Sequence, residues 1–172
     1  PYNNEKIIAG QSTAALELLQ KHNDLDILIA PVGGGGLLSG TALTCHYFYP
    51  KTTVIGAEPK GADDAFRSIQ ANKIIPSVNP KTIADGLLTS LGTLTFPIIK
   101  KHVAQIMTAQ EQSIIQAMRY IWERMKIIVE PSSAVPLAII LENLDYFNGK
   151  KVGIILSGGN VDLGNLPFYT AD

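Results

Sequence analysis

The stretch DILIAPVGGGG, residues 26–36, decides the fold class. Its apolar run is uninterrupted, rich in branched residues and bounded by Asp26 and by glycine, which is typical of a strand buried on both faces. Four glycines follow, and the next residues, LLSGTALTCHYFYP, predict a helix that packs closely through Gly40 and Ala42 and ends at Pro50. The sequence therefore predicts a unit of strand, glycine loop and helix.

The alternation of strands and helices continues along the chain. Buried-strand patterns recur at residues 53–57, 103–107 and 151–156, and helical patterns occur at residues 5–22, 37–50, 63–71, 108–125 and 132–144. Residues 74–86 are too rich in Pro, Asn and Asp for regular structure and predict an irregular loop. We expect an α/β fold with a mostly parallel sheet flanked by helices, in a single domain of residues 1–172. Ligands of such a fold gather beyond the carboxyl ends of the strands.

Two helix starts carry recognisable signals. Thr108 followed by Glu111 has the pattern of a capping box, and Ser132 or Ser133 could cap the following helix, where Pro136 is tolerable near the first turn. The first of these helices is expected to bury a stripe of Ile114, Met118, Ile121 and Met125.

Composition and charge exclude several classes of partner. The 172 residues contain 14 Lys and Arg against 15 Asp and Glu, for a net charge of -1. Nucleic acids and acidic membranes are bound mainly by clustered positive charge, so we expect no nucleic-acid and no membrane partner. The longest apolar stretches are far shorter than the roughly 20 residues of a membrane span. The lone Cys45 cannot pair within the chain, so we expect a reducing, cytoplasmic location.

The glycine run of residues 33–36 has the features of an anion-binding loop. Glycine lets the main chain approach a ligand closely, and the N–H groups at a helix start favour a phosphate. We predict phosphate binding, against the alternative of a tight turn that binds nothing. A nucleoside triphosphate is disfavoured because the loop ends Leu38, Ser39, Gly40, without the lysine of a Walker loop. The dinucleotide pattern G-x-G-x-x-G fails as well, because starts at Gly33, Gly34 and Gly35 have Leu38, Ser39 and Leu37, respectively, where a glycine is required.

A second glycine site, SGGN, follows the last predicted strand at residues 157–160. On the same sheet edge as the phosphate loop, Ser157 could direct its hydroxyl at a planar ligand while the glycines make room for it. The alternative is that Ser157 merely caps the strand end.

Five motifs together resemble a known enzyme family. In chain order they are PVGGGGLLSG, AEPKGADD, TIADG, WERMKIIVEPSSA and LSGGNVDL. They resemble the second half of the pyridoxal-phosphate enzymes of the threonine dehydratase and serine racemase family, which have the fold type II, or tryptophan synthase β-like, architecture. The resemblance covers nearly the whole chain, and five motifs in the same order are a specific signal.

The resemblance implies roles for individual residues. Gly33, Gly34, Gly35, Gly36 and the Leu37 amide would hold the phosphate of pyridoxal 5'-phosphate.

The resemblance also implies that Ser157 lies at the pyridine nitrogen, and that Gly86 lies against the ring face where a side chain would not fit. A hydroxyl cannot keep the nitrogen protonated as a carboxylate would. The ring is then a weaker electron sink, which suits loss of an α-proton together with a β-hydroxyl.

A cation site in the turn EPKGADD is implied by the same resemblance. Glu58, the Ala62 carbonyl and Asp64 supply hard oxygen ligands that suit Mg²⁺ or Ca²⁺. The alternative is a solvated acidic turn in which Asp63 caps the next helix.

The lysine that bonds to the cofactor, in a Ser-Phe-Lys type of context, and the Ser-Gly-Asn-His type of loop are not found in this sequence. We therefore expect the carboxyl half of a longer enzyme, inactive by itself. Its expected activity is dehydration of L-threonine or L-serine to a 2-oxo acid and ammonia, or serine racemisation.

We expect an amino-acid substrate and, for the full-length protein, a homodimer or higher homo-oligomer. One alternative is a non-catalytic nucleotide-binding module, in which residues 33–36 bind a diphosphate and Glu58 binds a ribose. The other is a structural fragment that binds nothing.

Overall fold

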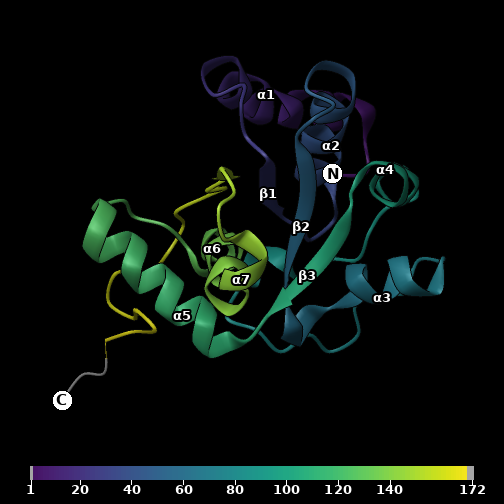
Figure 1. The fold of residues 1–172 in the computed structure, drawn as a ribbon. Helices are drawn as coiled ribbons and strands as arrows, with labels where there is room; N and C mark the ends of the chain where they lie inside the picture. The colour runs from purple at the N-terminus through teal and green to yellow at the C-terminus, as the bar shows by residue number, and fades with distance from the viewer. Residues whose placement is uncertain (1, 170–172) are drawn as a thin grey trace.

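A four-stranded parallel sheet forms the centre of the computed structural model, which describes residues 2–169 (Figure 1). Its strand order is β3-β2-β1-β4. The strands are β1 (Ile27–Pro31), β2 (Thr53–Pro59), β3 (Gln105–Ala109) and β4 (Val152–Ile154). The parallel α/β fold expected from the alternating pattern is confirmed.

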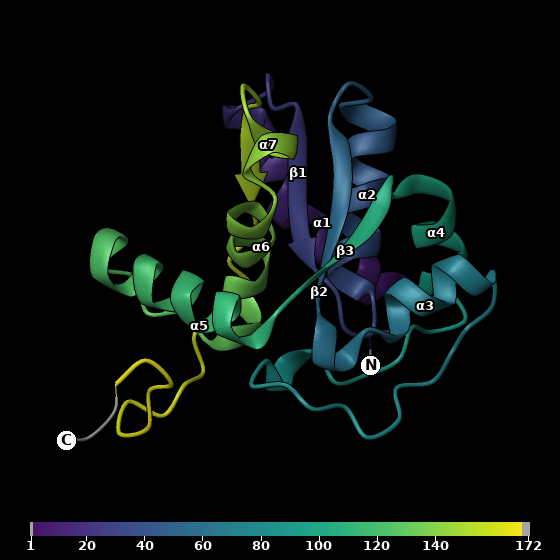
Figure 2. The same ribbon diagram turned by 60° about the horizontal axis from the view of Figure 1, so that its bottom comes forward.

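Helices cover both faces of this sheet, with α1, α2 and α4 on one side and α5, α6 and α7 on the other (Figures 1 and 2). The α-helices are α1 (Glu5–Lys21), α2 (Gly36–Phe48), α3 (Asp64–Ala71), α4 (Thr95–His102), α5 (Glu111–Tyr120), α6 (Pro131–Glu142) and α7 (Leu144–Phe147). Short 3₁₀ turns occupy Lys60–Ala62 and Asp85–Leu87, and a π-helical turn occupies Ile121–Met125.

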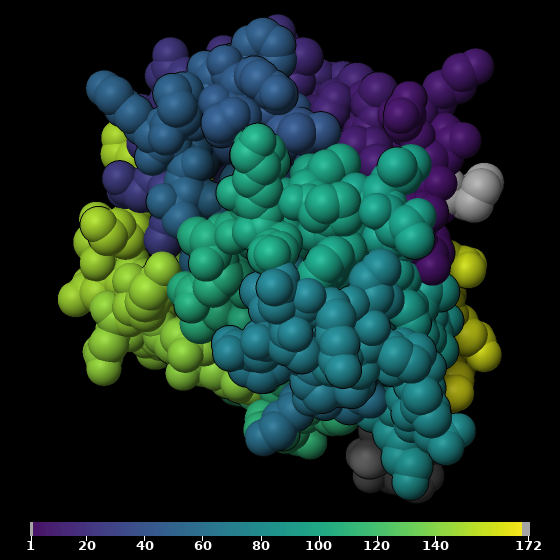
Figure 3. Space-filling model, turned by 90° about the vertical axis from the view of Figure 1, so that its right-hand side faces the viewer, coloured from purple at the N-terminus to yellow at the C-terminus, as the bar shows by residue number. Residues whose placement is uncertain are grey.

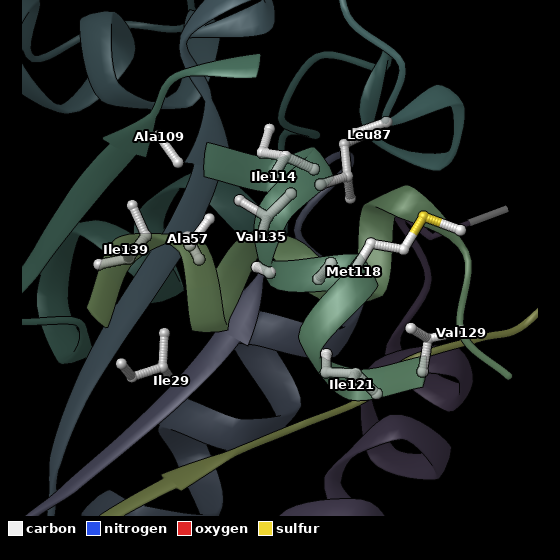
Figure 4. Close-up of a cluster of buried hydrophobic side chains, with 14 of the residues drawn as sticks. Ile29, Ala57, Leu87, Ala109, Ile114, Met118, Ile121, Val129, Val135 and Ile139 are labelled. Atoms are coloured by element: carbon white, nitrogen blue, oxygen red, sulfur yellow. The ribbon is translucent and has the colours of Figure 1, made fainter. Parts of the chain in front are cut away.

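The side chains of β1 alternate between two apolar clusters. Ile27 and Ile29 pack with α5 and α6, whereas Leu28 and Ala30 pack with α1 and α2. Figure 4 shows the first cluster, in which Ile29 lies among side chains of the neighbouring strand and helices. Burial of one Leu or Ile side chain contributes about 1.5–3 kcal/mol, so β1 is stabilised from both faces, as its continuous apolar run predicts.

The strand register brings two glycine-rich segments together. β1 pairs with β2 from Ile27↔Thr53 to Pro31↔Ala57, and with β4 from Ile27↔Val152 to Ile29↔Ile154. The carboxyl ends of parallel strands lie at one edge of a sheet, so the chain leaves β1 and β4 at the same edge.

The edge strand β3 is shielded by other segments of the chain. α3 packs beside β3. Seen from the right-hand side of Figure 1, the surface is formed largely by α3, α4 and the loop that joins them (Figure 3). Such covering protects the unpaired backbone groups of an edge strand from other chains.

The capping box expected at Thr108 is wrong. Thr108 lies within β3 and pairs with Glu58 of β2, and α5 begins only at Glu111 after Gln110, with no side-chain cap. Met125, expected in the buried stripe, is 56% exposed. The π-helical turn at the end of α5 changes the helical period there, so the 3.6-residue spacing no longer places Met125 on the buried face.

The start of α6 also differs from the prediction. Ser132 and Ser133 do not cap the helix, because α6 begins one residue earlier, at Pro131, after Glu130. Both serines lie in the first turn and are buried, and their hydroxyls contact other segments. α4 and α7 were not predicted from the sequence.

Among the described residues, no helix combines the length and the apolar character needed to cross a membrane.

Close contact between α1 and α2 makes the fold sensitive to an added methyl group at Gly40. A Cβ there would lie 2.6 Å from the carbonyl oxygen of Ile8 and from the backbone nitrogen of Ser12, whereas one on Gly10 would meet nothing within 4 Å. Gly40→Ala should lower the free energy of unfolding by about 1–3 kcal/mol, because the helices must separate. Gly10→Ala should raise it by about 0.5–1 kcal/mol. Denaturant unfolding measures both, and a neutral Gly40→Ala would contradict the close packing.

Candidate functional site

A cavity of about 400 Å³ lies at the edge where the chain leaves β1 and β4. It brings together the residues for which the sequence and the resemblance suggested cofactor contacts, namely Gly33, Gly34, Gly35, Gly36, Leu37, Gly86 and Ser157. Its lining also includes Tyr2, Thr89 and Glu130, which the sequence analysis did not single out. Three segments far apart in the chain therefore share one concave site.

The glycine loop presents backbone donors to this cavity. Gly35, the residue before α2, has φ +88° and contributes no side-chain cap, so the N–H groups of the first helical turn have no partner within the helix. The loop is held in place by the Thr95 hydroxyl, which donates to the Gly34 carbonyl oxygen at 2.8 Å. A fixed set of free N–H groups at a helix start is an anion-binding arrangement.

Glycine is required in this loop for steric reasons as well. A Cβ on Gly35 would lie 2.7 Å from Cδ1 of Ile99, in addition to the strain of its positive φ. A Cβ on Gly34 would overlap the ring of Tyr2, which lies against the loop. Tyr2 therefore forms part of the wall of the site.

Gly86 approaches the glycine loop from the opposite side. A Cβ on Gly33 would lie 3.1 Å from Cα of Leu87 and 3.2 Å from the Gly86 carbonyl oxygen. The Gly86 N–H donates to Oγ of Ser132 at 3.0 Å, and a Cβ on Gly86 would lie 2.9 Å from that oxygen. These contacts leave no room for a side chain at Gly33 or Gly86, so backbone forms this part of the cavity wall.

Ser157 belongs to a small hydroxyl cluster at the other end of the cavity. Its Oγ lies 3.2 Å from Oγ of the buried Ser133. The Ser133 hydroxyl donates to the Gly158 carbonyl oxygen at 2.6 Å and accepts from the Gly158 N–H at 2.6 Å. Ser133 thus fixes the backbone immediately after Ser157.

Glu130 is the carboxylate that lines the cavity. Its Oε2 accepts from the Asn160 N–H at 2.9 Å, and its backbone N–H donates to the Gly158 carbonyl oxygen at 3.1 Å. A Cβ on Gly158 would lie 3.0 Å from the Glu130 carboxyl group. Glu130, Ser132 and Ser133 all belong to the motif WERMKIIVEPSSA. The motif identified this segment as part of the resemblance but did not indicate the role of each residue.

The acidic turn lies outside the lining of the cavity. The oxygens Oε1 and Oε2 of Glu58 accept from the Ala65 and Phe66 N–H groups, both at 2.8 Å, and burial raises the pKa of Glu58 to about 8. Both carboxylate oxygens of buried Asp64 lack a hydrogen-bond partner, and burial raises the pKa of Asp64. Ala62 ends the 3₁₀ turn between them.

Within residues 2–169 there is no group of three or more His, Cys, Asp or Glu side chains that could hold a metal ion. Asp63, the alternative helix cap, makes no capping hydrogen bond and instead pairs with Arg67, Oδ1 to Nε, at 2.6 Å.

Cys45, two histidines and Trp122 lie outside the lining of this cavity. Burial raises the pKa of Cys45 to about 12, which leaves no thiolate at neutral pH. The rings of His46 and His102 lie 4.2 Å apart, centroid to centroid, away from the cavity of the glycine loop. The Trp122 Nε1–H donates to the Val129 carbonyl oxygen at 2.9 Å.

A free helix start that shares a cavity with a serine hydroxyl suits a phosphorylated ligand, and this defines the class of site. Comparison with known proteins narrows the class. The family model described as pyridoxal-phosphate dependent enzyme matches residues 1–158. The chain is 53% identical over 168 residues to the β-hydroxyaspartate dehydratase of Paracoccus denitrificans and 53% identical over 170 residues to the serine racemase of Dictyostelium discoideum. These alignments cover 98% and 96% of this chain and 53% and 52% of the relatives.

Solved structures show the same fold. The serine racemase of Dictyostelium discoideum superposes with a TM-score of 0.88 at 54% identity, over 94% of this chain and 52% of the other. The maize serine racemase superposes with a TM-score of 0.90 at 43% identity, over 94% of this chain and 52% of the other. The chain belongs to the family of pyridoxal-phosphate dependent enzymes of fold type II. It spans about half the length of the curated relatives it matches.

Proposed function

We propose that this chain is the carboxyl half of a pyridoxal-phosphate enzyme that acts on a β-hydroxy amino acid. The observation that carries the proposal is the meeting of the glycine loop, Gly86 and Ser157 in one cavity. Relatives named as serine racemase, β-hydroxyaspartate dehydratase and L-threo-3-hydroxyaspartate ammonia-lyase support a substrate with a β-hydroxyl. On the same resemblance, we propose a homodimer or larger homo-oligomer, and from the lone Cys45 we propose a cytoplasmic location.

The backbone of residues 33–37 would hold the cofactor phosphate. The N–H groups at the start of α2 have no helical partners, and the helix dipole favours an anion there. The phosphate would be held by the main chain, so its position is fixed by the fold and not by mobile side chains. When bound, pyridoxal phosphate withdraws electrons from the α-carbon of the attached amino acid.

Two further residues would orient the ring. Gly86 would lie against one ring face; it has no side chain to block the ring, and a Cβ there would lie 2.9 Å from Oγ of Ser132. Ser157 would place its hydroxyl at the pyridine nitrogen from the end of the last strand. Ring and phosphate are then held from two neighbouring strands of the sheet, β4 and β1.

The reaction would be either loss of the β-hydroxyl, giving a 2-oxo acid and ammonia, or return of the α-proton to the opposite face. L-Threonine and L-serine are the substrates that we propose for the first reaction, and serine for the second. A nucleotide-binding module has less support, because Glu58 is buried and lies outside the cavity that the glycine loop lines.

Residues 1–172 by themselves should form no 2-oxo acid from L-threonine. No lysine lines the cavity in the described part of the chain, and the covalent lysine would come from the amino half. The measurement is 2-oxobutanoate formation by the pure chain with added pyridoxal phosphate. Stoichiometric turnover by the pure chain would contradict the assignment of the covalent lysine to the amino half.

Gly36→Asp should weaken cofactor retention in the full-length protein by at least tenfold relative to Gly36→Asn. The two side chains have nearly the same shape and would crowd Tyr2 to the same degree, but only the aspartate places a negative charge beside the phosphate. The long-wavelength absorbance of bound pyridoxal, followed during dialysis, measures retention. Equal retention in the two variants would mean that the glycine loop is only a turn.

We propose a divalent cation, Mg²⁺ or Ca²⁺, at Glu58, the Ala62 carbonyl and Asp64. Its support in this structure is Asp64, a buried carboxylate neither of whose oxygens has a hydrogen-bond partner. A cation with water molecules would satisfy these oxygens. Glu58 would have to share or release its amide hydrogen bonds to take part.

Millimolar Mg²⁺ or Ca²⁺ should therefore raise the melting temperature of the full-length protein. At ten times the dissociation constant, binding adds about 1.4 kcal/mol, since the gain is RT ln(1 + [L]/Kd). Glu58→Gln should lose this dependence because it removes a unit of ligand charge. Asp63→Asn is the matched control, since Asp63 pairs with Arg67 and should leave the dependence intact. No shift with either ion in the unmodified protein would identify the turn as an acidic helix start without a cation.

A further inference from the structure

Thr95, the first residue of α4, contacts the glycine loop from outside the cavity. Its side chain is fully buried and is not part of the cavity lining. Its hydroxyl donates to the Gly34 carbonyl oxygen at 2.8 Å, across 61 positions of sequence. A carbonyl oxygen can only accept, so the Thr95 hydroxyl must be the donor. This hydrogen bond fixes one peptide group of the loop, the one between Gly34 and Gly35.

That peptide group carries a donor as well as an acceptor. Peptide groups are planar and trans, so the Gly35 N–H points opposite to the Gly34 carbonyl. Thr95 packs against Gly35 on the buried side of the loop, together with Leu91 and Ile99. The Gly35 N–H therefore points away from these side chains, toward the cavity that residues 33–36 line. Among the described residues, no backbone carbonyl accepts from this N–H.

The same peptide group could turn over if nothing held it. Glycines flank it on both sides, and glycine adopts positive and negative φ about equally readily. Gly35 has φ +88°, and the turned peptide would bring φ to the negative region that is ordinary for every residue. It would then present the Gly34 carbonyl oxygen to the cavity in place of the Gly35 N–H. An N–H attracts an anion and a carbonyl repels it, so this orientation decides whether the loop suits a phosphate.

We propose that Thr95 is a positioning residue that fixes the peptide group between Gly34 and Gly35 with its N–H toward the phosphate of the bound cofactor. This inference rests on the proposed function of the site. Thr95 does not contact the cofactor itself. It acts through the orientation of the backbone donor that does.

The turn that carries Thr95 is held firmly enough for this role. The Gly92 N–H donates to Oγ1 of Thr95 at 2.8 Å, and Oδ1 of Asn3 accepts from the Leu94 N–H at 2.7 Å. The Gly92 carbonyl oxygen lies 3.3 Å from the Thr95 hydroxyl and is the weaker acceptor, because the Gly34 carbonyl oxygen is 0.5 Å closer. Thr95 is therefore fixed on its own side and directs its proton at the glycine loop.

The test compares the affinity of the full-length apoprotein for pyridoxal phosphate with its affinity for pyridoxal, which lacks the phosphate. Thr95→Val keeps the shape of the side chain and removes the hydroxyl. It should weaken binding of pyridoxal phosphate by about tenfold or more and change binding of pyridoxal by less than about twofold, because the lost donor serves only the phosphate. Thr95→Ser keeps the hydroxyl and should keep both affinities within about threefold. Titration of the long-wavelength absorbance measures both ligands.

Thr93→Val is the matched control. Thr93 is exposed and lies two residues before Thr95, and its hydroxyl accepts from the side-chain amide of Asn3 at 3.0 Å. This variant removes a hydroxyl and a hydrogen bond from the same turn without touching the glycine loop. Both affinities should be unchanged.

The amide proton of Gly35 gives a direct NMR readout of the peptide orientation. On addition of pyridoxal phosphate, its signal should move downfield in the unmodified protein and in Thr95→Ser, because the amide then donates to an anion. In Thr95→Val at saturating cofactor the signal should stay in place. A downfield shift in Thr95→Val equal to that of the unmodified protein would contradict the proposal.

Equal affinity of Thr95→Val and the unmodified protein for pyridoxal phosphate would overturn the role of Thr95. An equal loss of affinity for both ligands in Thr95→Val would overturn it as well, since that result indicates a general loosening of the fold. If Thr95→Val does not fold, Thr95→Ala removes the same hydroxyl without a branched side chain and should show the same selective loss; unchanged binding there refutes the proposal. If the unmodified protein binds no pyridoxal phosphate, the proposed function is wrong, and this inference fails with it.

Discussion

Parallel pairing of β1 with both β2 and β4 is the constraint on which the rest of the molecule depends. It buries β1 from both faces, and it also directs the chain out of β1 and β4 at the same edge of the sheet. The glycine loop and the Ser157 segment are more than 120 positions apart in sequence and meet only because of this pairing. An antiparallel β4 would place Ser157 at the far end of the sheet, so the core and the site have a common origin.

The sequence allowed the strands, the main helices and the glycine site to be predicted, because each depends on a local pattern. The apolar runs at 27–31 and 53–57 give strands through burial alone, and four glycines before a helical pattern leave little choice for the loop. The errors arose where tertiary contacts override local preference. Thr108 has the composition of a helix cap but pairs with Glu58 in the sheet, and Met125 follows a π-helical turn that no 3.6-residue period describes.

The residues that support the site could not be predicted from local sequence patterns. Ser132 and Ser133 have the appearance of helix caps, yet one hydroxyl serves Gly86 and the other serves Gly158, at sequence separations of 46 and 25. A local pattern cannot reveal contacts between residues so far apart. Residues that we propose to touch a ligand were predicted from motifs, whereas the residues that hold them in place could be identified only from the fold.

The π-helical turn also contains a residue whose fluorescence can report on the site. Its Trp122 is the single tryptophan of the chain, and it is bonded through Nε1 to the Val129 carbonyl oxygen, next to Glu130. Its ring also packs edge-on against Phe168, with the centroids 5.7 Å apart. Intrinsic tryptophan fluorescence of this chain therefore comes from one known position, and its emission reports on the segment that leads into the site without any added label.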